Sequence, residues 1–138
     1  MNSYGKHVLG LMLCAALSGA AFAAQLDRFI QGYEAFQASD FRAALAFWRP
    51  LAAAGDARAQ YNLGVMYADG RGVAQNFAEA VRWWQMAGRQ GHVRALHNLA
   101  LAHIGGVTGN QDFLAARVFL RQAADHGFAN SQYTLGKL

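Results

Sequence analysis

Apolar residues recur along most of the chain at spacings of three and four, which is the period of an amphipathic α-helix. Between residues 25 and 38 they are Leu26, Phe29, Ile30, Tyr33 and Phe36. After Asp40, a second set occupies i, i+3, i+4 and i+7, so its members share one helical face: Ala44, Phe47, Trp48 and Leu51. The pattern predicts two helices, separated at Ser39 and Asp40.

This second face returns twice at an interval of 36 residues. The shifted sets are Ala80, Trp83, Trp84 and Ala87, followed by Ala116, Phe119, Leu120 and Ala123. Predicted N-caps shift with them, at Asp40, Asn76 and Asp112, as do the glycines that would end the helices, Gly55, Gly91 and Gly127. Because start signals, apolar faces and stop signals agree in register, the sequence predicts a structural repeat.

Another helix lies between these capped helices, and its copies read AQYNLG, ALHNLA and SQYTLG from residues 59, 95 and 131. Gly64 falls inside the first copy. Glycine costs a helix about 1 kcal/mol relative to alanine, so we expect a neighbouring helix to approach closely there. One hairpin cannot cover its own apolar face, whereas stacked hairpins bury a continuous core. The predicted fold is an all-α solenoid of antiparallel helix hairpins over residues 24–138, with units at 26–54, 57–90 and 93–126 and a final helix at 128–138.

Two positions depart from this regular pattern. Pro50 lacks a backbone N–H, so it is expected to kink or end its helix near Arg49. Thr108 replaces Gly72 of the preceding unit, which predicts a different turn in the second long loop.

The repeated residues resemble the Sel-one-like repeat, a relative of the tetratricopeptide repeat with a longer loop between its helices. The matching positions are Ala57, Ala59, Leu63, Gly64, Tyr67, Gly70, Gly72, Val73, Ala80, Trp84, Ala87 and Gly91. The second full unit departs from the pattern at His103, Ala100 and Thr108, and the first hairpin is more similar to an ordinary tetratricopeptide unit. The resemblance implies a right-handed superhelix and a role as a scaffold or adaptor.

The first 23 residues have the features of a cleaved secretory signal. Lys6 precedes an apolar run over residues 8–17, and the segment closes with Ala21-Phe22-Ala23. This run is too short to span a bilayer. We therefore expect cleavage after Ala23, a periplasmic or secreted protein, and no stable membrane insertion afterwards. Lipidation at Cys14 is a minor alternative, because Leu13 is too large for the position before a lipidated cysteine.

Composition narrows the class of protein. The chain has 138 residues, of which 54% are hydrophobic and 14% charged, so it has too much apolar material for a solvated disordered chain. The net charge is +4, or +3 once Lys6 is removed with the signal. This mild excess comes without a polybasic block, so nucleic acid is not an expected partner.

Catalytic and metal-binding patterns are weak in this sequence. Ser39 and Ser131 lie at helix boundaries and belong to no nucleophile motif. His97 and His103 are six residues apart, which does not give the i, i+4 pair of a zinc-binding helix. We expect no enzyme activity, no cofactor and no metal. An envelope hydrolase acting on cell wall or β-lactams remains an alternative.

The resemblance also implies where a partner would bind. First helices of stacked repeats line a concave groove, and ligand-facing positions flank the Leu-Gly pair. Those positions are Phe29, Tyr33, Arg58, Tyr61, Val65, Arg94, His97, Leu101, Asn130 and Tyr133. The expected partner is a protein or peptide segment, and an acidic one would suit these positions because arginine pairs well with carboxylates. A further alternative is a structural subunit that docks onto another chain through the final helix.

Overall fold

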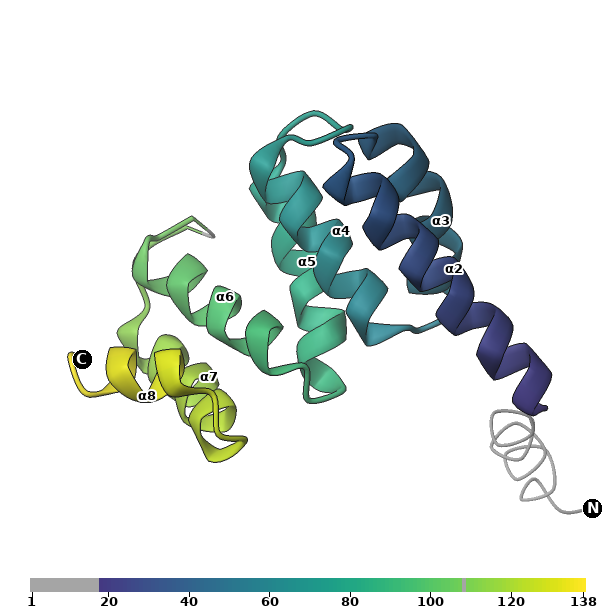
Figure 1. The fold of residues 1–138 in the computed structure, drawn as a ribbon. Helices are drawn as coiled ribbons and strands as arrows, with labels where there is room; N and C mark the ends of the chain where they lie inside the picture. The colour runs from purple at the N-terminus through teal and green to yellow at the C-terminus, as the bar shows by residue number, and fades with distance from the viewer. Residues whose placement is uncertain (1–17, 108) are drawn as a thin grey trace, which may run out of the picture.

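The computed structural model describes residues 18–107 and 109–138, and their regular structure is helical throughout. The helices are α2 (Gly19–Gln37), α3 (Phe41–Ala53), α4 (Ala57–Asp69), α5 (Phe77–Arg89), α6 (Val93–Ile104), α7 (Phe113–Asp125) and α8 (Ala129–Leu135). Successive helices pack against each other in pairs, and α8 packs on α7 (Figure 1). The predicted all-α solenoid is confirmed.

Helix boundaries follow the caps expected from the sequence. The side chains of Asp40, Asn76 and Asp112 each accept a hydrogen bond from the backbone N–H three residues ahead, at 2.9–3.1 Å. Each of these bonds satisfies a donor that the first turn of a helix leaves unpaired. Gly55 and Gly91 adopt φ values of 100° and 81°, the left-handed conformation that ends a helix.

Pro50 was expected to kink or end its helix near Arg49, and the expected end is wrong. Helix α3 continues through Pro50 to Ala53, and the Ala54 N–H donates to the Pro50 carbonyl at 3.0 Å. Pro50 lies in the last turn of α3. Its missing N–H therefore removes a single bond from the helix while the following residues resume the pattern.

The two long loops close in the same way despite their different sequences. The Asn76 N–H donates to the Tyr67 carbonyl at 2.9 Å, and the Asp112 N–H donates to the His103 carbonyl at 3.0 Å, one repeat further on. The loops also share a left-handed glycine, since Gly70 and Gly106 both have φ of 66°. Thr108, where the turn was predicted to differ, lies outside the described residues.

The core repeats one contact between a small residue and a large one. A Cβ atom added to Gly32 would lie 2.3 Å from the Trp48 indole nitrogen, and one added to Gly64 would lie 2.2 Å from that of Trp84. Each indole N–H donates to the carbonyl three residues before its glycine, at 3.1 and 3.3 Å. The close approach predicted at Gly64 is confirmed.

The third unit makes the same contact with altered sizes. Ala100 stands where the glycine was and Leu120 where the tryptophan was, and both are fully buried. The larger residue on α6 is therefore matched by a smaller one on α7. The aromatic column of the sequence belongs to the core, as predicted, because Trp48 and Trp84 are also buried.

Residues 1–17 of the predicted signal segment lie outside the described residues. Its last residues form the first turns of α2, where the Ser18 hydroxyl accepts from the Ala21 N–H at 3.4 Å. These turns extend beyond α3, and Phe22 is exposed (Figure 1). Within the described part of the chain, no helix combines the length and apolar character needed to cross a membrane.

Candidate functional site

Three adjoining cavities meet around Tyr61 on the face built from α2, α4 and α6. One of about 410 Å³ lies between α4, α5 and α6, and one of about 460 Å³ lies near the start of α4 and α6, beside α2. The third, of about 160 Å³, lies between α2 and α4. We call the continuous surface that Tyr61 joins the groove, the first cavity the apolar pocket and the second the polar pocket.

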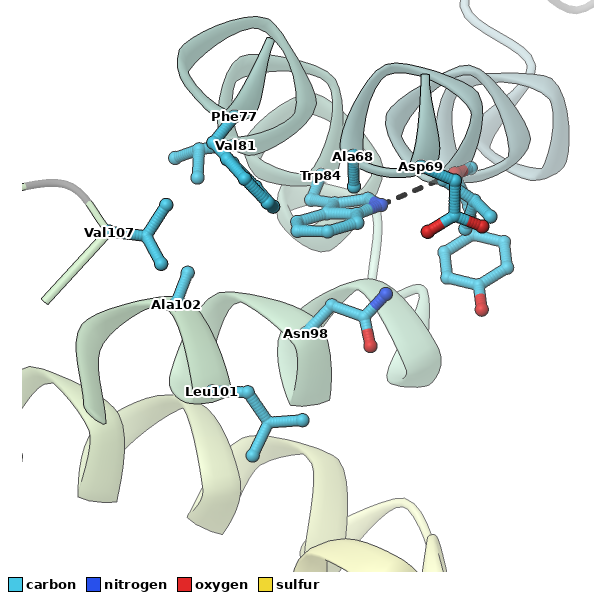
Figure 2. Close-up of a pocket in the computed structure, with 11 residues that line it drawn as sticks. Ala68, Asp69, Phe77, Val81, Trp84, Asn98, Leu101, Ala102 and Val107 are labelled. Atoms are coloured by element: carbon cyan, nitrogen blue, oxygen red, sulfur yellow. Dashed lines mark hydrogen bonds between the residues drawn. The ribbon is translucent and has the colours of Figure 1, made fainter. Parts of the chain in front are cut away.

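The apolar pocket is built around the indole of Trp84. Figure 2 shows this ring across from Asn98 and Ala102 of α6, with Val81 and Val107 closing the other side. The same indole N–H is bonded to the Tyr61 carbonyl, so the core contact that sets the repeat also fixes one wall of the pocket. The lining is mostly apolar, with Asn98 supplying an amide. Such a cavity suits a bulky apolar side chain.

Arg58 lies in the polar pocket and forms an ion pair with Asp56. Its guanidinium makes a two-point contact with Asp56, at 3.2 Å from Nε and 2.7 Å from Nη2, and lies 4.4 Å from the Phe29 ring centre. Partial burial alone would raise the pKa of Asp56, but hydrogen bonds from Arg58 and from backbone N–H groups outweigh it and lower that pKa. The Asp56 bond in turn raises the pKa of Arg58. Asp56 also caps α4, so this pair belongs to the scaffold.

His92 lines the polar pocket beside Tyr61. Its Nδ1 accepts from the Ala95 N–H at 3.3 Å and so caps α6, while its ring stacks on Tyr61 at 4.7 Å between centres. Burial, followed by the positive charge of Arg94, lowers the pKa of His92. Both the cap and the lowered pKa favour the neutral imidazole, because a protonated Nδ1 has no lone pair to accept the bond.

Arg94 is exposed at the edge of the polar pocket. Within residues 18–107 and 109–138, none of the ion pairs includes it. With Arg58 matched by Asp56, Arg94 supplies the net positive charge of this end of the groove.

The two full hairpins have counterparts among known proteins. The Sel1 repeat matches residues 57–92 and 93–128, just over half of the chain. The chain belongs to the Sel1 repeat family. Proteins with this repeat generally serve as protein-interaction modules, and the fold is typically a non-enzymatic scaffold.

Two solved structures share the Sel1 repeat fold with this chain. A Sel1 repeat protein from Oxalobacter formigenes is 28% identical with a TM-score of 0.75, over 81% of this chain and 45% of that one. The protein c5321, a protective antigen of uropathogenic Escherichia coli strains, is 27% identical with a TM-score of 0.76, over 86% of this chain and 26% of that one. The chain thus spans less than half of either relative. No curated protein matches it.

Seven of the ten positions predicted to bind a partner line the groove of these Sel1 repeats. They are Phe29, Tyr33, Arg58, Tyr61, Val65, Arg94 and Leu101. The structure places the other three elsewhere. His97 points its Nδ1 at Ser131 of α8, and Asn130 and Tyr133 are exposed on α8, where Lys137 lies 4.2 Å from the Tyr133 ring.

Sequence reasoning missed three residues of the groove. Asn62 and Asn98 are one repeat apart, and each lines a pocket beside its Sel1 repeat. Their signal was the asparagine shared by AQYNLG and ALHNLA. His92 was not among the predicted binding positions, although it occupies the capping position that Asp56 holds one repeat earlier.

A serine and a histidine come together in the structure, which bears on the hydrolase alternative. The Oγ of Ser131 lies 2.9 Å from His97 Nδ1, a distance that a nucleophile and its base would have. Ser131 has no exposed surface, however, and it occupies the buried packing position of Ala59 and Ala95 in the preceding Sel1 repeats. A substrate cannot reach its hydroxyl in this arrangement. Within the described residues, no three metal-binding side chains gather into a cluster.

Proposed function

We propose that this protein is a non-enzymatic interaction module of the bacterial cell envelope, which binds a segment of a partner protein along the groove. One observation carries the proposal: α2, α4 and α6 together present exposed aromatic and apolar side chains around adjoining cavities. Tyr33 is 50% exposed and Leu101 is 45% exposed at the two sides of this surface. Large exposed side chains beside a preformed cavity are typical of protein-binding sites.

Two features of the chain support a role without catalysis. Cys14, inside the predicted signal segment, is its only cysteine, so a processed protein would have no thiol. Ser131 pairs with a histidine but is fully buried. A protein-binding groove needs neither group.

The groove is tested by capture of envelope proteins on variants that add a charge to it. Tyr33→Asp and Leu101→Asp change exposed residues at its two sides, and Leu114→Asp is the matched control because Leu114 is 77% exposed on α7, outside the groove. We expect both groove variants to lose the captured partner while Leu114→Asp retains it, with all three melting like the wild type. Equal recovery by all proteins would count against the groove.

The envelope location rests on the N-terminal segment and has its own test. The protein from its native host should be recovered from the periplasm or medium, with Ala24 as its first residue. A cytoplasmic protein that still carries residues 1–23 would contradict the location without affecting the groove.

A second candidate role is docking through the last helix. Tyr133 is 67% exposed and Leu138 is 42% exposed at this end of the chain, where a partner could cover them. If α8 carries the interaction, Tyr133→Glu should abolish capture and Leu101→Asp should not.

A further inference from the structure

The charges of the groove leave one cation without a partner. Arg58 is matched by Asp56 at 2.7 Å, and Asp69, at the far side of the apolar pocket, is matched by Arg71 at 3.3 Å. Arg94 takes part in none of the ion pairs of the described residues. The groove therefore combines a mostly apolar pocket, whose one carboxylate is already paired, with one guanidinium outside these ion pairs, and a carboxylate would complement it.

Helix α6 sets the distance between these two features. Arg94, Asn98 and Ala102 follow one another at i, i+4 and i+8, and all three line the groove. An α-helix rises about 1.5 Å per residue, so the apolar pocket lies about 6–12 Å along the axis from Arg94. An extended chain advances about 3.3 Å per residue, so about two to four residues cover that distance.

Asn98 lies on the wall of the apolar pocket, four residues after Arg94 on the same helix, where the backbone of a ligand would pass. Among the hydrogen bonds of the described residues, none uses the Asn98 side chain. Its amide offers both a donor and an acceptor, which suits a peptide group in an extended chain. Asn62 holds the equivalent position one repeat earlier, beside Tyr33.

We propose that the groove recognises an extended peptide segment with two determinants at a fixed spacing. A leucine, phenylalanine or tryptophan side chain enters the apolar pocket against Trp84, and an acidic side chain two to four residues away pairs with Arg94. The backbone between them passes Asn98. This ligand class rests on the proposed function, since it specifies what the groove binds.

The test uses fluorescent decapeptides and the purified full chain, with binding followed by fluorescence anisotropy. Each peptide has one tryptophan and one glutamate in an uncharged Ser/Asn background, at spacings of one to five residues and in both orders. We expect affinity to peak at a spacing between two and four residues, in one order. Replacing the glutamate by glutamine should weaken that peptide about tenfold, as expected for loss of a charge-assisted hydrogen bond. Equal affinities at all spacings would overturn the proposal.

Variants of the protein assign each determinant to its residue. Arg94→Gln should bind the glutamate and glutamine peptides equally, whereas Arg121→Gln, an exposed arginine on α7, should still distinguish them. Leu101→Asp should lose the preference for tryptophan over alanine, and Leu114→Asp should keep it. Discrimination that survives Arg94→Gln would place the carboxylate elsewhere and overturn the assignment.

The outcomes separate this inference from the function on which it rests. If groove variants abolish capture of the native partner but the peptides show no preferred spacing, the ligand class is wrong and the groove stands. If neither experiment responds to the groove variants, both proposals fail.

Discussion

Gly64→Ala offers a sharp test of how the repeat is held together, because two effects of the same methyl group oppose each other. Alanine favours a helix over glycine by about 1 kcal/mol. In this structure, however, the added Cβ would lie 2.2 Å from Trp84 Nε1 and 2.4 Å from its Cδ1. Ordinary contacts begin near 3.5 Å, so the indole would have to move by more than about 1 Å.

The free energies can be compared from the structure. Overpacking of this kind costs about 2 kcal/mol. Separating the indole N–H from the Tyr61 carbonyl costs about 1 kcal/mol more, because Trp84 is only 7% exposed and water cannot readily replace the bond. After the gain in helix propensity, Gly64→Ala should destabilise the protein by about 2 kcal/mol. Urea unfolding followed by far-ultraviolet circular dichroism would measure this difference.

The third repeat supplies the matched background. Leu120 and Ala100 pack there in place of the tryptophan and glycine, so Trp84→Leu should make room for a methyl group at position 64. In that background Gly64→Ala should stabilise by about 1 kcal/mol, which gives a coupling of about 3 kcal/mol between the two sites. If Gly64→Ala stabilises the wild type as much as it stabilises the Trp84→Leu protein, close helix approach is not the reason for the glycine.

Three further predictions concern the scaffold beside the groove. Trp84→Ala should cost about 3–5 kcal/mol in urea unfolding, whereas Val118→Ala, at a position 56% exposed, should stay within about 0.5 kcal/mol. Asp56→Ala should cost about 1–2 kcal/mol by removing the α4 cap, and the same melts should show it. The pKa of His92 in the folded protein lies below its ordinary value of 6.5, so the His92 imidazole binds a proton more tightly in the unfolded chain than in the folded one. The free energy of unfolding should therefore fall as pH drops below about 6.5. His92→Asp should keep the α6 cap and reduce this loss in melts from pH 7.5 to 5.

Much of the scaffold could be predicted because the same caps, apolar faces and glycines recur in each repeat. Asp40, Asn76 and Asp112 were identified as caps from their position before an apolar face, and each makes the expected bond. Gly64 was identified as a site of close helix approach because a glycine destabilises the interior of a helix. The caps depend on local backbone geometry, which a single stretch of sequence specifies, whereas the Trp84 ring that fills the space beside Gly64 comes from the next helix.

The chemistry of the groove depends on contacts that local patterns do not contain. Arg58 and Asp56 are two residues apart, a spacing that does not pair side chains within a helix, but Asp56 lies outside α4 as its cap and can reach the guanidinium. His97 and Ser131 are 34 residues apart and meet only because α8 returns beside α6. The two arginines of the predicted site are therefore not equivalent: Asp56 pairs with Arg58, whereas Arg94 takes part in none of the ion pairs of the described residues.

The measurement that tests groove binding most directly is photo-cross-linking in the native host. A photoreactive amino acid would be placed in turn at Tyr33 and Asn98 in the groove and at Val118 on the exposed face of α7. We expect the same partner to be attached from both groove positions and not from Val118. Attachment from Val118 alone, or from no groove position, would contradict binding in the groove.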